Sequence, residues 1–151
     1  MKFRTLSFVV ACLAFLLAGC RGPTGLLPGG ALEGLGVASS TPSDWAFAGE
    51  AGAIKLETNP STPYSVNLAF TVIDHRIFIN AGGTETQWAM NIATDPHIRL
   101  LLDGLLYDLR AERVTDPMQI ENFADAWTGQ SFFRRDPRHY AEVWIFELVE
   151  R

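Results

Sequence analysis

Short apolar or alternating stretches, separated by turn-forming residues, recur along residues 44–151 of this chain. The pattern is clearest at residues 105–114, where apolar side chains at 105, 107, 109 and 111 alternate with charged ones at 108, 110 and 112. A period of two places successive side chains on opposite faces, which is typical of a half-buried strand. Similar patterns predict strands at residues 45–48, 53–58, 65–73, 76–80, 98–102, 105–114 and 140–149.

Two pairs of these strands are predicted to form hairpins. Asp74-His75 separates residues 65–73 from residues 76–80, and Asp103-Gly104 separates residues 98–102 from residues 105–114. Asp-Gly between two apolar runs is a strong hairpin signal, because a type I′ turn needs positive φ at both central residues.

Two helices interrupt the strands. Residues 85–93 form the first, which Asp95-Pro96 ends because proline disfavours the helical conformation in the residue before it. The second begins at Asp116 as N-cap with Pro117 next, and apolar residues follow at 120, 123, 124 and 127 before Gly129. The fold class is therefore mainly β with two helices (β+α), arranged as a small barrel of six or seven strands.

The chain opens with the order of a secretory signal peptide. Lys2 and Arg4 precede an apolar run at residues 6–17, and Ala18-Gly19-Cys20 follows. The run is too short to span a bilayer as a helix, which needs about 20 apolar residues. We therefore expect residues 1–19 to be cleaved.

The sequence Leu17-Ala18-Gly19-Cys20 resembles the lipobox of bacterial lipoproteins. That resemblance implies cleavage before Cys20, diacylglycerol on its sulfur and a fatty acyl group such as palmitate on its new amine. With Arg21 next, it also implies the periplasmic face of the outer membrane in a cell that has one. Residues 20–43 are rich in Gly and Pro and are expected to be a flexible tether to a domain at residues 44–151.

Charge and cysteine content exclude some classes of function. The formal net charge is −5, and loss of Lys2 and Arg4 with the leader makes it more negative, so the chain lacks the basic face of a nucleic-acid-binding protein. The leader also contains Cys12, which leaves Cys20 as the only cysteine. An internal disulfide and a cysteine-based metal site are therefore excluded.

The most promising local feature is Gly82-Gly83-Thr84, between a predicted strand and a predicted helix. Free N–H groups at a helix N-terminus, with nearby threonine hydroxyls, can bind a phosphate. However, Thr84-x-x-Gln87 also matches a capping box, whose side chains satisfy only the helix's own donors. The sequence leaves both interpretations open.

Other site signals are weak, and no catalytic residue is identified. His75, His97 and His139 are far apart in sequence, so we predict no metal site. Arg134-Arg135-x-x-Arg138 is the one basic cluster; it is either a clamp for a phosphate or carboxylate or an ordinary solvated loop.

Residues 63–149 resemble the FMN-binding split barrel of the pyridoxamine 5′-phosphate oxidase-like superfamily, including its deazaflavin-dependent branch. The resemblance rests on the order of five features: the hairpin at 65–80, Trp88-x-x-Asn91-Ile92-x-x-Asp95-Pro96, the strand at 98–102, Tyr107-x-x-x-Ala111-x-x-Val114-x-Asp116 and the aromatic last strand. It implies a homodimer with the flavin at the subunit interface.

The resemblance also implies positions for the cofactor. Thr84, Thr86 and Gln87, with Trp88 beside them, would lie at the flavin phosphate, while Ser65, Val66 and Asn67 would border the isoalloxazine ring. This chain departs from many flavin-binding members, because no Lys or Arg lies near the helix start and Glu85 would repel a dianion. Arg76, Arg99 or Arg134 could supply the missing positive charge at the phosphate, but the sequence does not show where they lie in the fold.

Two functions remain open. One is a noncatalytic binding or structural lipoprotein of the cell envelope, anchored in the bilayer through Cys20, with weak or lost flavin binding and an envelope protein as possible partner. The other is an FMN- or deazaflavin-dependent oxidoreductase, in which the cofactor carries the chemistry. Whether the chain is an enzyme and whether it holds any cofactor are not decided by the sequence.

Overall fold

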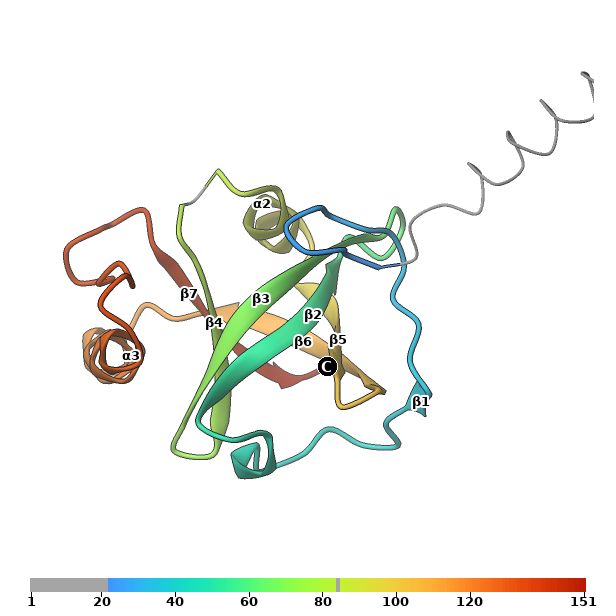
Figure 1. Cartoon of the computed structure of the whole chain (residues 1–151), viewed down its shortest axis with the longest axis horizontal. Helices are drawn as coiled ribbons and strands as arrows, with labels where there is room; N and C mark the ends of the chain where they lie inside the picture. Colours follow the sequence, from blue (N-terminus) through green and yellow to red (C-terminus); the bar gives the residue numbers. More distant parts are fainter. Residues whose placement is uncertain (1–21, 84) are drawn as a thin grey trace, which may run out of the picture.

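The computed structural model describes residues 22–83 and 85–151. Within these ranges the chain forms seven strands, two α-helices and a short 3-10 helix (Figure 1). The strands are β1 (Gly36–Val37), β2 (Ala51–Thr58), β3 (Tyr64–Ile73), β4 (Arg76–Ala81), β5 (His97–Leu102), β6 (Leu105–Arg113) and β7 (Trp144–Glu150). The helices are η1 (Ala46–Ala48), α2 (Gln87–Thr94) and α3 (Pro117–Gly129). The predicted signal peptide, Cys20 and Thr84 lie outside the described residues.

Six of the strands close into a barrel. Their order is β6-β5-β2-β3-β4-β7, and β7 pairs antiparallel with β6 to complete the ring. β1 adds to β6 as a short parallel strand. The predicted fold class, a split barrel of six or seven strands with two helices, is confirmed.

The two helices cover different parts of this barrel. Trp88, Ala89 and Ile92 of α2 are buried in the main core with apolar residues from the barrel strands. α3 packs outside, where Phe123 contacts Phe78 of β4 with ring centroids 6.2 Å apart and belongs to a second, smaller core. Figure 1 shows α2 at one end of the barrel and α3 alongside the barrel.

Both predicted hairpins form with left-handed turns. Asp74 and His75 have φ of 49° and 66°, and Asp103 and Gly104 have φ of 50° and 82°. The strand predicted at residues 45–48 is wrong, since these residues belong to a turn around η1. The Asp44 carboxylate accepts a hydrogen bond from the Ala46 N–H at 2.7 Å, and this local bond replaces a strand ladder.

Residues 22–43, expected from their composition to be a flexible tether, contact the barrel at several points. Gly29 forms an isolated bridge with Ser65 at the start of β3, and Leu32 is 3% exposed. Further along, the Trp45 N–H donates to the His75 carbonyl in the β3–β4 turn. Figure 1 shows this segment, blue to cyan, running along one side of the barrel. A domain boundary near residue 44 stays a prediction.

Candidate functional site

The junction of β4 and α2 was the main candidate from the sequence. α2 begins later than expected, with Thr86 as its N-cap and Gln87 as its first helical residue. Gln87 Nε2 donates to Asn91 Oδ1 at 2.8 Å, one turn further along. The other residue of the predicted capping box, Thr84, lies outside the described residues, so the capping box stays a prediction. Thr86 Oγ1 donates backward to the Gly83 carbonyl at 3.2 Å and leaves the first turn without a side-chain cap from Thr86.

A hollow opens beside this helix start. Its volume is about 420 Å³, and it is lined by Gly83, Glu85, Thr86 and Glu142. A Cβ added to Gly82 or Gly83 would meet no atom within 4 Å, so the backbone there borders open space. The hollow borders the start of α2, and two of its described lining residues, Glu85 and Glu142, are acidic.

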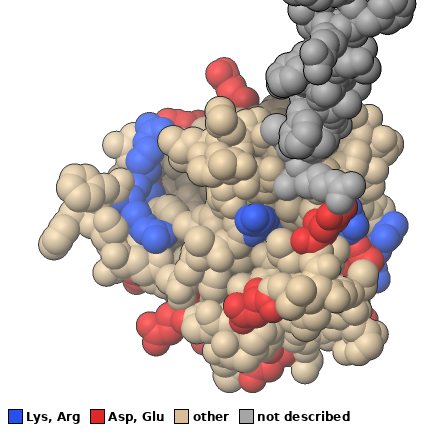
Figure 2. All heavy atoms as spheres, turned by 45° about the vertical axis from the view of Figure 1, so that its right-hand side comes forward, with Lys and Arg blue, Asp and Glu red and all other residues tan. Residues whose placement is uncertain are grey.

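Among the described residues, Arg135 reaches this junction; it belongs to the basic cluster named from the sequence, but it was not one of the three arginines expected to compensate for the missing cation. Arg135 Nη1 donates to the Gly82 carbonyl at 2.9 Å, and its Nη2 lies 3.2 Å from Glu142 Oε1. Its guanidinium also lies 4.2 Å from the centre of the Tyr140 ring. Arg135 is thus already paired with a carboxylate of the hollow. Figure 2 shows one face of the molecule, with basic side chains along one flank of a depression.

The three cations named from the sequence lie elsewhere. Arg76 pairs with Glu147 at 3.1 Å, and Arg99 makes two hydrogen bonds of 2.9 and 2.7 Å to the buried Glu57 carboxylate. The Arg134 guanidinium stacks 3.6 Å from the centre of the Trp127 ring on α3. None of these contacts places a free cation at the start of α2.

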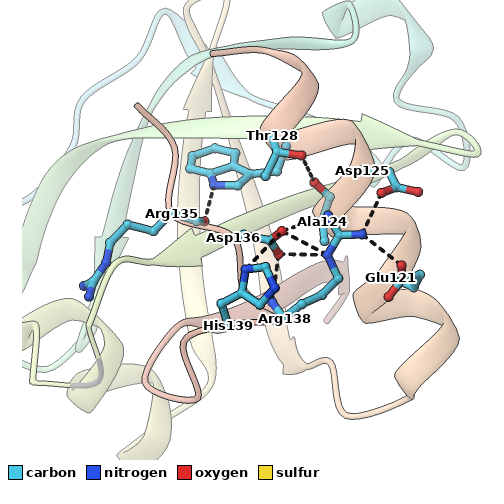
Figure 3. Close-up of polar contacts among 9 residues, drawn as sticks. Glu121, Ala124, Asp125, Thr128, Arg135, Asp136, Arg138 and His139 are labelled. Carbon is cyan, nitrogen blue, oxygen red and sulfur yellow. Dashed lines mark hydrogen bonds and ion pairs between the residues drawn. The ribbon is translucent and has the colours of Figure 1, made fainter. Parts of the chain in front are cut away.

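Arg138 holds the loop that carries Arg135 (Figure 3). Its guanidinium bonds Asp136 and also reaches Glu121 and Asp125 on α3, at 2.8 and 2.9 Å. These carboxylates, Asp136 foremost, raise the pKa of Arg138. The Trp127 indole N–H donates to the Arg135 carbonyl at 3.1 Å, which fixes the same loop a second time. The basic cluster is therefore divided: Arg138 locks the loop, Arg134 packs on α3 and Arg135 reaches the junction.

The strand residues assigned to the flavin ring by resemblance are engaged by the chain itself. β3 pairs with β4 only from Phe70 onward, which leaves the first half of this β3 edge without β4. Ser65 exchanges backbone hydrogen bonds of 2.9 and 2.8 Å with Gly29, and its Oγ donates to the Gly30 carbonyl at 2.6 Å. Asn67 Nδ2 donates to the Gly25 carbonyl at 2.7 Å. Val66, between them, is partly buried and packs on the main core.

A chain of polar contacts joins the two halves of the predicted site. Asn91 Nδ2, on α2, donates to Thr58 Oγ1 at 2.9 Å, and Thr58 Oγ1 donates to the Tyr64 carbonyl at 3.2 Å. Asn91 in the middle of α2 is therefore linked through the end of β2 to the start of β3, so α2 and the start of β3 lie at the same corner of the barrel. Trp88 faces away from this corner, because it is 6% exposed and packs edge-to-face on Phe146.

The residues present do not fit a flavin at this corner. The resemblance places the flavin phosphate at the start of α2, where Glu85 and Glu142 line the hollow and the nearby Arg135 is paired with Glu142. Ser65 is fully buried beneath the segment that contains Gly29 and Gly30. A ring edge could reach Ser65 only if that segment moved away.

The three histidines remain separate in the fold. His75 pairs with Asp44 at 2.9 Å, His97 with Asp95 at 2.7 Å and His139 lies 3.7 Å from Asp136. Across residues 22–83 and 85–151, no group of three His, Cys, Asp or Glu side chains is arranged to hold a metal ion. In the same ranges, no helix combines the length and the apolar character needed to cross a bilayer.

Comparison with known proteins places the fold. No protein-family model and no curated protein matches the chain. Among solved structures, a Listeria innocua protein described as a pyridoxamine 5′-phosphate oxidase aligns with a TM-score of 0.52 and 15% identity over 64% of this chain and 82% of its own. A conserved hypothetical protein from Mycobacterium tuberculosis aligns with a TM-score of 0.55 and 21% identity, over 76% and 84%. A nimC/nimA family protein from Clostridium acetobutylicum gives 0.50 and 12%, over 68% and 74%. The chain has the split-barrel fold of pyridoxamine 5′-phosphate oxidase-like proteins.

Proposed function

We propose that this chain is a membrane-anchored split-barrel lipoprotein that acts as a noncatalytic binding or structural protein of the bacterial envelope, with flavin binding weak or lost. The lipobox-like sequence ending at Cys20 supports the anchor, and Arg21 after it supports the periplasmic face of the outer membrane in a cell that has one. The pyridoxamine 5′-phosphate oxidase-like fold supports descent from flavin-binding barrels.

One observation carries the proposed loss of the cofactor. The segment of residues 25–32 pairs with the edge of β3 where the ring would lie, through two backbone bonds, the Ser65 hydroxyl and the Asn67 amide. A buried hydrogen-bonding group is costly to leave unpaired. A flavin would have to replace each of these bonds and also displace the buried Leu32.

The acidic hollow supports the same conclusion. A phosphate dianion beside Glu85 and Glu142 would be repelled at close range, and Arg135 would have to leave Glu142 to compensate. In a noncatalytic protein the barrel surface would bind a protein partner. A homodimer is the expectation from the resemblance, and a separate envelope protein is the expectation from the noncatalytic hypothesis.

An FMN- or deazaflavin-dependent oxidoreductase is the second candidate. It is favoured by the start of α2, where the N-cap Thr86 makes no side-chain capping bond and lines a hollow of about 420 Å³. The description of the Listeria innocua neighbour as an oxidase points the same way.

A flavin titration of the purified full chain in detergent distinguishes the two candidates. We expect flavin fluorescence to show no saturable quenching when FMN is titrated, because both ends of the expected site are occupied or acidic. Saturable quenching that Thr86→Glu abolishes would overturn the proposal and support the oxidoreductase. Thr94→Glu places the same charge at the other end of α2 and is the matched control.

A further inference from the structure

The described chain begins in a closed loop on the barrel surface. Gly22 and Gly29 lie so close that a Cβ added to Gly29 would be 2.0 Å from the Gly22 carbonyl carbon. Between them, Thr24 and Leu27 exchange backbone hydrogen bonds of 3.1 and 3.0 Å. We name residues 24–27 the leucine turn. Its position on the barrel is fixed by Asn67 Nδ2, which donates to the Gly25 carbonyl.

The leucine turn presents its apolar side chains to solvent. Leu26 is 102% exposed and Leu27 is 70% exposed, while Gly22 and Pro23 just before them are buried. Two adjacent leucines on a tight, anchored turn are poorly placed to join the core, because the bonds to Asn67 and Ser65 hold the loop on the outside. The turn therefore offers a fixed apolar tip.

The short chain between the predicted lipid and the barrel brings this tip close to the bilayer surface. Gly22 follows the predicted lipidated Cys20 by only two positions, which can span at most about 7 Å. The polar headgroup region on each side of a bilayer is roughly 5–8 Å thick. A barrel whose surface holds Gly22 must then lie directly on the membrane, with the start of its N-terminal loop at the headgroups.

We infer that the leucine turn inserts Leu26 and Leu27 into the bilayer interface next to the acyl chains, as a second contact that orients the barrel on the membrane. This inference rests on the proposed lipid anchor at Cys20. Met90, 48% exposed on α2, belongs to the same end of the barrel, since Asn91 beside it bonds Thr58 next to the start of β3. The exposed Phe132 and Phe133 follow α3, which Figure 1 shows on another side of the barrel.

The test is depth-dependent quenching in vesicles. The full chain carrying Thr24→Cys is produced in a lipoprotein-processing bacterium, labelled on the new thiol with the environment-sensitive dye NBD and reconstituted in phosphatidylethanolamine–phosphatidylglycerol vesicles. We expect a blue-shifted emission and a loss of about half its intensity when lipids spin-labelled near the headgroup are included. The same dye at Met118→Cys, an exposed position on α3, should show neither change.

A second variant separates insertion by the leucines from insertion by the dye. Thr24→Cys combined with Leu26→Ser and Leu27→Ser should lose most of the quenching. Both leucine side chains are largely exposed, so the serines should leave the fold intact. Equal quenching with serines would overturn the inference. So would a blue shift without quenching by spin-labelled lipid, since a second copy of the chain would then cover the turn.

The mass of the N-terminal peptide keeps the two claims apart. A peptide that begins at Cys20 with its lipid mass, together with an unquenched probe at residue 24, would overturn the insertion of the leucine turn into the bilayer and would support the lipid anchor. A peptide without lipid refutes the proposed anchor and the inference that rests on it.

Discussion

Asp136 and Arg138 show how single residues position the candidate site. The Asp136 carboxylate accepts hydrogen bonds from Arg138 Nε at 2.9 and 3.0 Å and from Nη2 at 2.8 Å. These bonds, assisted by the Arg138 backbone N–H, hold the pKa of Asp136 below its ordinary value of 3.8. Because Arg138 also binds two carboxylates of α3, Asp136 helps fix the loop that brings Arg135 to Gly82.

The lowered pKa makes a pH-dependent prediction. A carboxyl group whose pKa is depressed in the folded state contributes stability above its unfolded value, here about 3.8, and loses it as the pH falls through the folded value. Asp136→Asn should therefore lower the free energy of unfolding in urea at neutral pH, and the difference from the wild type should vanish in acid below that range. Asp125→Asn, which removes one exposed contact to Arg138, is the control and should have a smaller effect. A loss for Asp136→Asn that is independent of pH would contradict the argument.

The two helices differ at their starts. Asp116 caps α3, accepting a hydrogen bond from the Gln119 N–H at 2.9 Å, and Pro117 occupies the first turn. The Thr86 side chain provides no equivalent bond for α2. The capped helix α3 packs against the outside of the barrel. The start of α2, which Thr86 does not cap, borders the hollow.

Removal of the α3 cap has a defined expected cost. Asp116→Ala should reduce the free energy of unfolding by about 1 kcal/mol, because one N–H of the first turn loses its partner. Chemical denaturation measures the change, and exposed Thr115→Ala, just before the cap, should be close to neutral. An Asp116→Ala protein as stable as the Thr115→Ala protein would show that the cap contributes nothing to α3.

At the scale of the whole molecule, stability comes from the closed barrel. The β6–β7 pairing joins the two ends of the sheet. Leu109 on β6 is completely buried in the main core. The N-terminal segment then adds to the outside of a ring that is already closed, through β1 and the contacts of Leu32 and Gly29.

Two leucine-to-alanine variants test this division. Leu109→Ala should destabilise the protein by about 2–5 kcal/mol, because it leaves a cavity in the closed core. Leu26→Ala should change the free energy of unfolding by less than about 0.5 kcal/mol, since its side chain is fully exposed. Denaturation curves compare the two directly, and equal losses would mean that the leucine turn belongs to the core.

Much of the fold could be predicted because its signals are local. The alternation in residues 105–114, the Asp103-Gly104 turn and the Asp116-Pro117 helix start each depend on residues close in sequence. The structure confirms the turn, the helix start and a strand over Leu105–Arg113. The alternation of burial holds from residue 107 to residue 111, whereas Leu105 is exposed and Leu106 is buried. The strand predicted at 45–48 failed because the Asp44 side chain offered the backbone a competing bond. The site was harder to predict, since Arg135 reaches Gly82 across 53 positions of sequence.

The sequence by itself determined the class of fold, both hairpins, the α3 cap and the expectation of a lipid at Cys20, because each follows from periodicity, turn chemistry or a contiguous motif. Only the tertiary structure decided that residues 25–32 cover Ser65 and Asn67, that Glu142 joins Glu85 at the hollow and that the basic cluster divides among three places. These are contacts between distant segments. They depend on β4 pairing with β3 only from Phe70 onward, which leaves the first half of that β3 edge free for the N-terminal segment. No local pattern of residues encodes where this pairing stops.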